Sequence, residues 1–587
     1  MDAAHPTRLS SAVFAAKAAG LRLRRSLADA AAPAPRLSRK GADFGEVAGA
    51  VRSPLWSDET LAERAMQLGK VQNLRVAARA LDGLVIPTGA VFSFWRNVGP
   101  PTAARGYVPG RMLQQGCMVA SVGGGLCQLS NALYEAALEA GCHIVERHAH
   151  SRVVPGSLAA EDRDATVAWN YVDLRFMADR ALRLSVRLDR ETLSVSLLAE
   201  DSAFVSASGP ELATAGSPLM ARSCASCGET DCFMHERAST VPPEGASRRA
   251  FLVDEAWPEF KSYVHRAATP ADRLGLPLDG ARLHLARYAW PTSGFERVSS
   301  APVDALRRSW ALRSAGLQGA NRRNAELAAA ECIAASLARS LAPDIVQVTV
   351  AQSYLPFLWR DGVLGGRDVS VLMTRLPMDV LQERLDAAAH AHPHATLGDF
   401  RAPAWLVDAE AEALANAVRI VTPHAEIAAL FGARAVRLPW QTPPARSRAG
   451  TPMRRIGFPG PTVARKGAHA VREAALALDL EVMPLGAELE GEGFWRGVRL
   501  APPGDWTTAD VIVQPALVED QPRRLLAALA AGIPAIATPA CGLDPQPGLK
   551  LIPPCDPEAL IAALASASQT APAGSDPPRA AETGRAP

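Results

Sequence analysis

Residues 121–141 read Ser121-Val-Gly-Gly-Gly-Leu-Cys127-Gln128-Leu-Ser-Asn131-Ala-Leu-Tyr134-Glu-Ala-Ala-Leu-Glu-Ala140-Gly141. Three consecutive glycines allow positive φ and let another chain or a substrate approach the backbone closely. Apolar residues then recur at helical spacing as far as Gly141, a residue that suits a helix C-terminus. The stretch therefore predicts a glycine loop followed by a helix, around which the N-terminal part of the chain is organised.

Cys127 is predicted to lie at or just inside the start of this helix. Unpaired backbone N–H groups and the positive end of the helix dipole favour a thiolate there and can hold an oxyanion. Cys127 is therefore a candidate nucleophile, and Gly123, Gly124, Gly125 and Gln128 are the candidate substrate and oxyanion residues. The alternative is that Cys127 is a small buried residue at a tight junction between loop and helix.

Composition limits the class of protein. A chain of 587 residues is too long for one hydrophobic core, so about three domains are expected. The net charge of +2 leaves no dominant basic face, which argues against a nucleic-acid partner. Nine cysteines, three of them close together, fit reduced thiols and a metal site better than a secreted disulfide framework.

We see no export signal and no membrane span in the sequence. No stretch approaches the ~20 apolar residues that a transmembrane helix needs. Basic residues interrupt the N-terminal Ala/Leu pattern, so no signal-peptide core is recognised. We therefore expect a cytoplasmic protein. Residues 8–28 are predicted to form a basic amphipathic helix, which would lie on the inner membrane face or instead be solvated or dock on the protein itself.

The N-terminal part of the chain alternates in the manner of antiparallel strands. Residues 1–45 are predicted to be a basic arm and a linker, and a long helix is expected from about Asp58 to Leu81. After the cysteine helix, alternating apolar residues predict further strands to about Leu198. We therefore expect an α+β domain over residues 46–205, with one central helix against a sheet.

Two histidines occur in the segment Glu146-Arg147-His148-Ala-His150. Because side chains alternate along a strand, His148 and His150 would point to the same face. A thiol needs a base or a positive environment to ionise at neutral pH, and histidine, with an ordinary pKa of about 6.5, suits that role. The alternatives are a structural hydrogen-bonding pair and two metal ligands on one strand face.

Short motifs over about residues 70–200 resemble the VanW domain. In the family's order and spacing they are Phe92-Ser93-Phe94, Val98-Gly99, Gly106-Tyr107, Gly123-Gly-Gly-x-Cys127-Gln128, Leu133-Tyr134, Glu146-Arg147-His148-x-His150-Ser151 and Asp164-Ala-Thr166. The family is named from vancomycin-resistance clusters, and some members are similar to L,D-transpeptidases that use the motif cysteine on peptidoglycan stem peptides. The resemblance implies that Cys127 is the nucleophile, that His148 or His150 is the base, and that Asp164 orients it. A cytoplasmic member would meet wall precursors, recycled muropeptides or another amide.

Residues 206–245 contain a cysteine-rich loop, Cys224-Ala-Ser-Cys227-Gly-Glu-Thr-Asp-Cys232-Phe-Met-His235. The spacing C-x2-C-x4-C-x2-H supplies the four ligands of a closed tetrahedral Zn²⁺ site. Such a loop is too short to have a core, so the metal would supply its fold. We predict structural zinc here. The alternatives are an iron–sulfur cluster and chance clustering of cysteines in a linker.

The second half of the chain alternates strands and helices, which predicts parallel sheets covered on both faces. One set spans residues 246–445 and a second spans 446–567, after which the tail over 568–587 is predicted to be disordered. Leu283–Tyr288 is expected to be a strand of the first set. Two Rossmann-like halves leave a cleft where the carboxyl ends of their strands meet.

This half resembles the group 1 glycosyltransferases, which are retaining enzymes of GT-B fold. The matching pieces are Gly460-x5-Lys466-Gly467, Asp510-Val-Ile-Val-Gln-Pro515, Val518-Glu519 and the run from Leu525 to Gly542. In that family an Arg/Lys pair binds the donor diphosphate, and two glutamates contact the sugar and the ribose. The resemblance implies a nucleotide-sugar site with Gly460, Arg465 and Lys466, and with Glu519 as its catalytic residue.

This chain departs from the glycosyltransferase pattern at two places. Ala527 stands where the second glutamate is expected and cannot hydrogen-bond a ribose hydroxyl, and Phe458-Pro459 occupy the place of a basic residue. A lost hydrogen bond to a charged group costs roughly 1.5–3 kcal/mol. One hypothesis is therefore a two-headed cell-envelope enzyme, which transfers peptides or amides at Cys127 and sugars in the second half. The other is a non-catalytic protein that binds glycans or muropeptides through a degenerate GT-B module.

Overall fold

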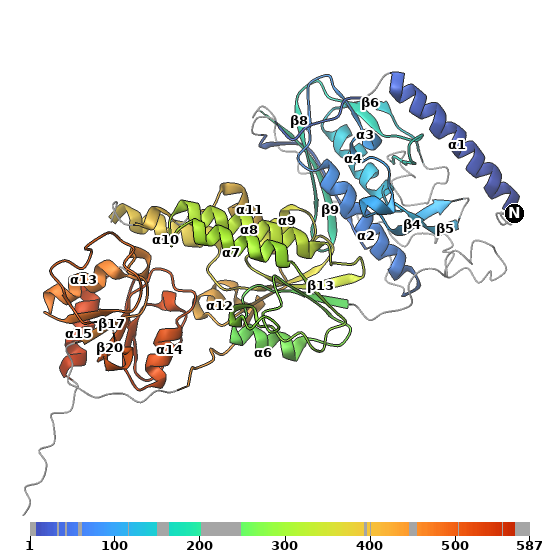
Figure 1. The fold of residues 1–587 in the computed structure, drawn as a ribbon. Helices are drawn as coiled ribbons and strands as arrows, with labels where there is room; N and C mark the ends of the chain where they lie inside the picture. The colour runs from blue at the N-terminus through green and yellow to red at the C-terminus, as the bar shows by residue number, and fades with distance from the viewer. Residues whose placement is uncertain are drawn as a thin grey trace, which may run out of the picture.

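Three regions of mixed helix and strand follow one another along an elongated molecule (Figure 1). The computed structural model describes residues 8–31, 34–40, 44–56, 61–114, 117–149, 164–200, 248–391, 396–399, 401–444, 455–502, 504–554 and 556–569. His150 and the predicted zinc ligands Cys224, Cys227, Cys232 and His235 lie outside these ranges. None of the helices within them is long and apolar enough to cross a membrane.

The N-terminal region packs antiparallel sheets against helices, as predicted, but two buried helices rather than one central helix cover them. Its elements are α1 (Arg8–Ala31), β1 (Glu46–Pro54), α2 (Leu61–Leu81), β2 (Val85–Ile86), β3 (Val91–Ser93), α3 (Phe94–Val98), β4 (Pro109–Gln114), β5 (Cys117–Val122), α4 (Cys127–Glu139), β6 (His143–Glu146), β7 (Arg175–Met177), β8 (Leu182–Leu188) and β9 (Thr192–Ala199). The sheets run β1-β9-β8-β2 and β3-β7-β6, with β4-β5 as a separate hairpin. Every second side chain of β8 and β9 is buried, and α4 packs against β1 and β9.

The glycine loop before α4 is pressed against strand β4. Gly123 and Gly125 have φ of 79° and 96°, where other residues are strained. A Cβ on Gly124 would lie 2.2 Å from the carbonyl oxygen of Gly110. Asn73 of α2 donates hydrogen bonds to the carbonyl oxygens of Gly124 and Val108, at 2.9 and 3.0 Å. Positive φ at two positions and backbone contact at the third therefore explain the triple glycine.

Lys70 of α2 lies beneath this loop. A Cβ on Gly125 would be 2.2 Å from the Cγ of Lys70, so the lysine stem fills the space that the glycine leaves. The side chain is almost fully buried, and this burial, with a smaller effect of Arg111, lowers the pKa of Lys70 to about 7. A single lysine in a mixed helix gives no sequence signal, so the sequence did not indicate it.

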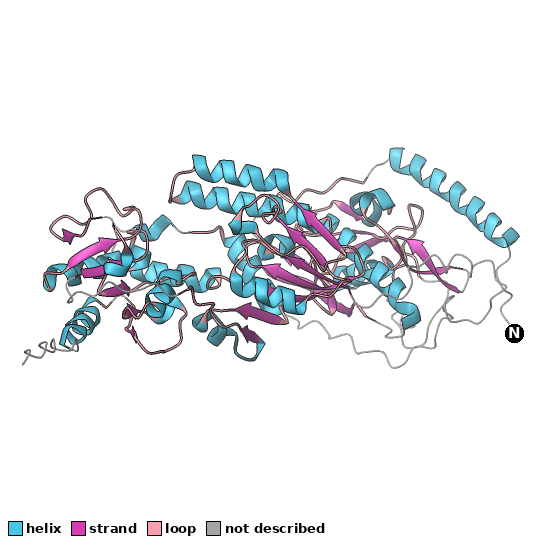
Figure 2. Ribbon diagram, turned by 60° about the horizontal axis from the view of Figure 1, so that its bottom comes forward, coloured by secondary structure: helices cyan, strands magenta, loops and turns pink. Residues whose placement is uncertain are grey.

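The middle region is a seven-stranded parallel sheet with helices on both faces (Figure 2). Its elements are β10 (Arg248–Leu252), α6 (Pro258–Ala267), β11 (Arg273–Leu276), β12 (Arg297–Ser300), α7 (Pro302–Ser314), α8 (Ala320–Ala338), β13 (Ile345–Ala351), α9 (Leu355–Arg360), β14 (Asp368–Leu372), α10 (Met378–Ala391), α11 (Ala404–Asn416), β15 (Arg419–Thr422), α12 (Ala425–Phe431) and β16 (Ala435–Arg437). The strand order β12-β11-β10-β13-β14-β15-β16 changes direction between β10 and β13.

The predicted strand at Leu283–Tyr288 is wrong. A turn leads there into the 3-10 helix η3 (Ala286–Tyr288). His284 has φ of 56°, which interrupts an extended backbone. Leu283 and Leu285 are 51% and 45% exposed, so the apolar alternation has no buried face to support a strand.

The third region is a six-stranded parallel sheet of order β19-β18-β17-β20-β21-β22. Its elements are β17 (Arg455–Phe458), α13 (Ala468–Ala477), β18 (Glu481–Pro484), β19 (Arg499–Leu500), β20 (Val511–Gln514), α14 (Arg523–Ala530), β21 (Ala535–Ala537), β22 (Leu549–Leu551) and α15 (Pro557–Gln569). Its order changes direction between β17 and β20. The two Rossmann-like halves of a GT-B arrangement are thus present, as expected from the alternation of strands and helices.

The N-terminal region is joined to the middle region by buried contacts. Arg75 of α2 donates to the carbonyl oxygen of Gly365 at 2.6 Å. The N–H of Gly366 donates to the backbone carbonyl oxygen of Asp189, also at 2.6 Å. A Cβ on Gly365 would lie 2.4 Å from the Cβ of Leu188. The β8–β9 turn therefore packs directly on the loop before β14.

Replacement of Gly124 by alanine tests the contact between the loop and β4. The added Cβ meets a backbone oxygen that cannot move away, and overpacking of this kind costs about 1–3 kcal/mol. We expect Gly124→Ala to lower the melting temperature of the intact chain by several degrees. Gly45→Ala is the matched control, because a Cβ there meets no atom within 4 Å. Equal melting temperatures for the two variants would contradict this packing.

Burial of Lys70 predicts a pH dependence of stability. Its pKa is 10.5 in the unfolded chain and about 7 in the fold, so between these values the unfolded state binds more protons. The free energy of unfolding should therefore rise with pH over this window, by at most about 1.4 kcal/mol per pH unit. Lys70→Met should remove this rise in chemical denaturation between pH 7 and 9. The exposed control Lys550→Met should keep it, and a wild-type slope in Lys70→Met would disprove the assignment.

Candidate functional sites

Cys127 is the first residue of α4, directly after the glycine loop, which confirms its predicted position at the helix start. Its side chain is partly buried. The sulfur lies 3.5 Å from the hydroxyl oxygen of Thr166 and 3.9 Å from the carbonyl oxygen of Val167. The motif Asp164-Ala-Thr166 and the cysteine motif therefore meet at this point.

Residues 164–167 connect the start of α4 with the histidine segment. Ser130 donates to the carbonyl oxygen of Ala165 at 2.5 Å, and Asn131 accepts the N–H of the same residue at 2.8 Å. On the other side, the N–H of Thr166 donates to the carbonyl oxygen of His148 at 2.8 Å. Cys127 and His148 thus lie on either side of one short segment, although they are far apart from each other in the sequence.

The side chains of His148 and Asp164 contact neighbours of their own. The Nε2 of His148 lies 3.2 Å from a carboxylate oxygen of Glu146, and the imidazole is about half exposed. Arg147 donates to the carboxylate of Asp164 at 3.0 Å and to its carbonyl oxygen at 2.6 Å. Glu146 is thus the acid that orients His148 in the structure. The catalytic roles of Cys127, His148 and Asp164 remain predictions.

Gln128 and the first two glycines serve the fold. The amide of Gln128 donates to the hydroxyl of Ser53 at 3.0 Å and to the carbonyl oxygen of Pro54 at 2.7 Å. The N–H groups of Gly123 and Gly124 donate to Val108 and Ser121. These contacts support the loop from β1, from β5 and from the residue before β4. The substrate role that the sequence predicts for these residues stays a prediction.

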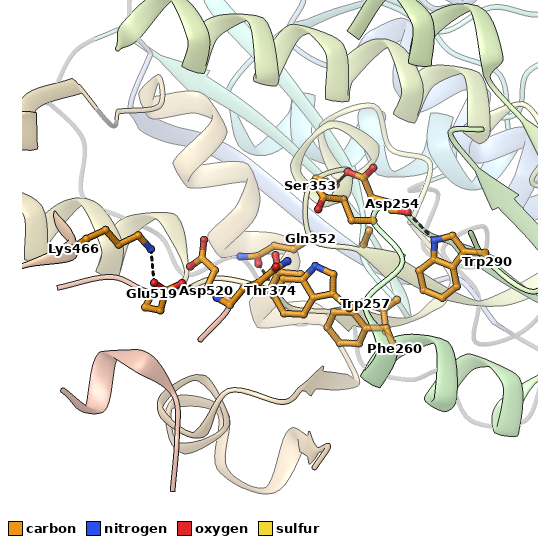
Figure 3. A pocket seen from close by; sticks show the side chains of 14 residues that line it. Asp254, Trp257, Phe260, Trp290, Gln352, Ser353, Thr374, Lys466, Glu519 and Asp520 are labelled. Atoms are coloured by element: carbon orange, nitrogen blue, oxygen red, sulfur yellow. Dashed lines mark hydrogen bonds and ion pairs between the residues drawn. The ribbon is translucent and has the colours of Figure 1, made fainter. Parts of the chain in front are cut away.

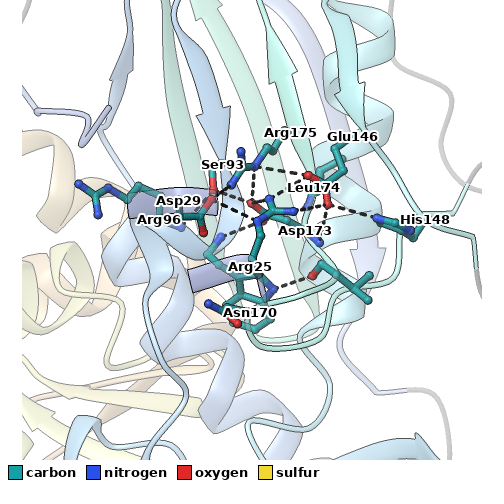
Figure 4. A network of polar contacts seen from close by, with 12 residues as sticks. Arg25, Asp29, Ser93, Arg96, Glu146, His148, Asn170, Asp173, Leu174 and Arg175 are labelled. Carbon is teal, nitrogen blue, oxygen red and sulfur yellow. Dashed lines mark hydrogen bonds and ion pairs between the residues drawn. The ribbon is translucent and has the colours of Figure 1, made fainter. Parts of the chain in front are cut away.

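Helix α1 docks on the histidine segment through a network of charges (Figure 4). Arg25 donates to both carboxylate oxygens of Glu146, at 3.0 and 2.9 Å. Burial opposes the charge on Glu146, but the guanidinium of Arg25 and its other partners hold the pKa of this carboxyl below its ordinary value. Asp173, buried and bonded to Ser93 at 2.6 Å, completes the network. Docking on the protein itself, one of the alternatives for residues 8–28, is therefore observed for one face of the helix.

A pocket of about 370 Å³ opens where the carboxyl ends of the two parallel sheets face each other (Figure 3). Asp254 follows β10 and Gln352 and Ser353 follow β13, so both strands at the reversal of the middle sheet contribute. Glu519 and Asp520 follow β20 at the reversal of the third sheet. Such reversals are where open α/β sheets bind ligands.

Lys466 and Glu519, predicted from different motifs, form an ion pair in this pocket. The amine of Lys466 lies 3.0 Å from one carboxylate oxygen of Glu519. The amide of Gln514 donates to the same oxygen, and the N–H of Gln521 donates to the other. Burial raises the pKa of this carboxyl, but Lys466 together with the hydrogen bonds from Gln521 and Gln514 outweighs that effect, and the pKa of Glu519 is lowered. A Cβ on Gly460 would be 3.3 Å from the Lys466 stem, and the Arg465 carbonyl accepts the N–H of Leu517.

The opposite wall of the pocket was not identified from the sequence. Asp254 accepts two hydrogen bonds from Arg308, at 2.8 and 3.2 Å, and one from Ser353 at 2.9 Å. Aromatic side chains of Trp257, Phe260 and Trp290 line the same wall. Asp254 directly follows the apolar run of a parallel strand, at the end of the sheet where ligands bind. That position is the sequence signal from which this wall could have been predicted.

A partly buried ion pair joins the two halves near the pocket, beside the lining residue Trp257. Arg523, the first residue of α14, donates to both carboxylate oxygens of Glu259 of α6, at 2.7 and 2.6 Å. Its guanidinium also lies over the rings of Trp257 and Trp440. In the part of the chain that the structure describes, no three His, Cys, Asp or Glu side chains converge to hold a metal ion.

Comparison with known proteins relates these regions to known families. Residues 69–198 match the family model described as VanW like protein. The chain is 36% identical over 118 residues to the uncharacterized protein YoaR of Bacillus subtilis strain 168, which is 20% of this chain and 38% of that protein. It is 33% identical over 153 residues to the vancomycin B-type resistance protein VanW of Enterococcus faecalis, which is 25% of this chain and 55% of that protein. It thus spans about half or less of these relatives.

Among solved structures, the chain is similar to HepE of Anabaena in complex with UDP and glucose. The match is 13% identical, covers 55% of this chain and 90% of that one, and has a TM-score of 0.33. Because this score is below 0.5, the GT-B assignment depends on the two opposed sheets themselves. The chain therefore carries a VanW domain at residues 69–198, followed by two Rossmann-like halves in a GT-B arrangement.

Proposed function

We propose that the protein is a two-headed cell-envelope enzyme acting peripherally at the inner membrane face. One head would transfer a peptidoglycan-type stem peptide through Cys127, and the other would transfer a sugar from a nucleotide sugar to a glycan or glycopeptide precursor. The observation that carries the proposal is that Thr166 contacts the sulfur of Cys127 and the backbone of His148, which brings three VanW motifs together in a chain that also holds a pocket between two opposed parallel sheets.

The cysteine head is proposed to act by acyl transfer. The thiolate attacks the carbonyl carbon of an amide, the carbon–nitrogen bond breaks, and the amine leaves with a proton from a histidine. The proton that the histidine donates comes from the Cys127 thiol. A second amine then attacks the thioester carbonyl and gives its proton to the histidine, and the carbon–sulfur bond breaks to release the thiolate of Cys127. Because Gly123, Gly124 and Gln128 use their N–H groups within the fold, the N–H groups of Gly125 and Leu126 are the proposed donors to the oxyanion.

His148 and His150 are both retained as candidates for the base. Glu146, at 3.2 Å, orients the His148 ring, and Arg25 in turn holds Glu146. Asp164 is bonded to Arg147, the residue before His148, and we propose that it positions the histidine segment through that contact.

The cysteine head predicts a reactive thiol at Cys127. Alkylation of the intact chain, followed residue by residue with mass spectrometry, should show Cys127 reacting at a pH at least one unit below that of an ordinary thiol. Cys332 of α8 is an exposed internal control in the same molecule. Cys127→Ala should abolish acyl transfer with the fold intact. Identical pH profiles for the two cysteines would count against a nucleophile.

The sugar-transferring head is proposed to bind its donor at Lys466 and Glu519. Arg465 and Lys466 would hold the diphosphate, Gly460 would allow close approach, and Glu519 would contact the sugar. Lys466 would exchange its bond with Glu519 for bonds to phosphate. The acceptor would lie toward Asp254 and the aromatic wall, since aromatic faces and a fixed carboxylate suit a sugar.

A non-catalytic glycan-binding module is the second candidate for this half. Ala527 lacks the side chain that would hold the ribose, and Pro522, directly before α14, offers no N–H to a phosphate. Under this alternative the pocket binds a wall or capsule fragment without turnover.

Donor binding distinguishes a nucleotide-sugar site from a glycan-binding site. Nucleotide diphosphate sugars should raise the melting temperature of the intact chain, and Lys466→Ala should weaken binding at least about tenfold, because charged hydrogen bonds are lost. Lys550→Ala is the control, since Lys550 is an exposed lysine outside the pocket. Absence of both turnover and any nucleotide-dependent shift would exclude the transferase and favour the binding module.

A further inference from the structure

Helix α1 uses its polar face to bind its own protein. Arg22 donates to the carbonyl oxygen of Trp169 at 2.7 Å, Ser26 accepts from Asn170 at 3.2 Å, and Asp29 accepts from Arg175 at 2.7 Å. Together with Arg25 and the buried Ala18, these residues recur at helical spacing and form one face. The polar side of an amphipathic helix, which usually faces water, is here turned inward.

The opposite face of α1 is apolar and exposed. We define the outer stripe as Leu9, Val13, Ala16, Gly20, Leu23 and Leu27, which follow one another at intervals of three or four residues. The four large members, Leu9, Val13, Leu23 and Leu27, are 76%, 47%, 64% and 65% exposed. Figures 1 and 2 both show α1 at the outer edge of the molecule, with its N-terminal half projecting from it.

Positive charge accompanies the outer stripe. Lys17 and Arg24 are exposed along one flank of it, about 60–80° around the helix by the 3.6-residue turn. The one acidic residue of α1, Asp29, is held on the inner face by Arg25 and Arg175. An apolar stripe flanked by cations is the surface that inserts at the boundary of an anionic bilayer. A second copy of the chain fits less well, because pairing two stripes would bring their cations together.

We propose that the outer stripe of α1, with Lys17 and Arg24, binds the surface of a bilayer containing anionic lipid. The inference rests on the proposed function, which places the protein at the inner face of the membrane. It names anionic lipid as the partner that α1 contacts there. Because Arg25 joins the same helix to Glu146, the lipid surface would lie beside the segment that carries His148, within reach of a lipid-linked precursor.

Vesicle sedimentation of the intact chain tests this surface. The probe is phosphatidylcholine vesicles with and without an equal part of phosphatidylglycerol. The wild type should bind the anionic vesicles, weakly bind the neutral ones, and release at high salt. Leu23→Ser with Leu27→Ser should reduce binding at least tenfold. Lys17→Gln with Arg24→Gln should reduce binding to the anionic vesicles by roughly fivefold per charge.

Matched control variants distinguish binding through the outer stripe from nonspecific adsorption of other exposed side chains to the vesicles. Leu306→Ser with Leu317→Ser removes apolar side chains that are 63% and 70% exposed on and after α7, and Arg307→Gln removes an exposed charge there. These variants should bind vesicles as the wild type does. So should Cys127→Ala and Lys466→Ala, whose loss of activity would leave the membrane result unchanged.

Several outcomes would overturn the inference. They are equal binding by wild type and the stripe double variant, no preference for anionic vesicles, and no vesicle binding at all. A dimer in sedimentation velocity that Leu23→Ser with Leu27→Ser dissolves would assign the stripe to a second copy instead. All double variants change exposed side chains, so an unchanged melting temperature confirms that each has folded.

Discussion

The contact between the glycine loop and strand β4 is the constraint on which the cysteine site depends. Gly124 and Gly110 approach so closely that neither tolerates a Cβ, and Asn73 ties the loop to α2. This contact fixes where α4 begins and therefore where Cys127 lies. Residues 164–167 then bond to the first turn of α4 and to the backbone of His148. The VanW motifs are therefore held together by the contact between Gly124 and Gly110 and by the hydrogen bonds of residues 164–167.

The second half depends on two opposed reversals of strand order. Each reversal leaves a gap at the carboxyl edge of its sheet, and the two gaps share one pocket. Arg523 and Glu259 bridge the halves, and because the carboxylate of Glu259 is fully buried, loss of Arg523 would leave that charge buried without its counter-ion. Arg75 and the β8–β9 turn hold the N-terminal region against the loop before β14 of the middle sheet. The cysteine site and the pocket are therefore both attached to the middle region.

The sequence predicted the features that have a local pattern. The glycine loop, the start of α4, the antiparallel strands and the two parallel halves all follow from glycine placement and from periods of two and 3.6 residues. Leu283–Tyr288 has the alternation of a strand but no buried face, so the prediction failed there. Lys70, Arg25 and Asp254 were missed because their importance comes from distant partners, namely the glycine loop, Glu146 and Arg308.

The most direct measurement of the central claim is the capture of an acyl group on Cys127. The intact chain is incubated with a peptidoglycan-type stem peptide, quenched in acid and digested, and the peptides are examined by mass spectrometry. The account predicts an added acyl mass on the peptide that contains Cys127, removed by hydroxylamine as a thioester is. Acylation at another residue, or no adduct on Cys127 from any stem peptide that the protein cleaves, would contradict it.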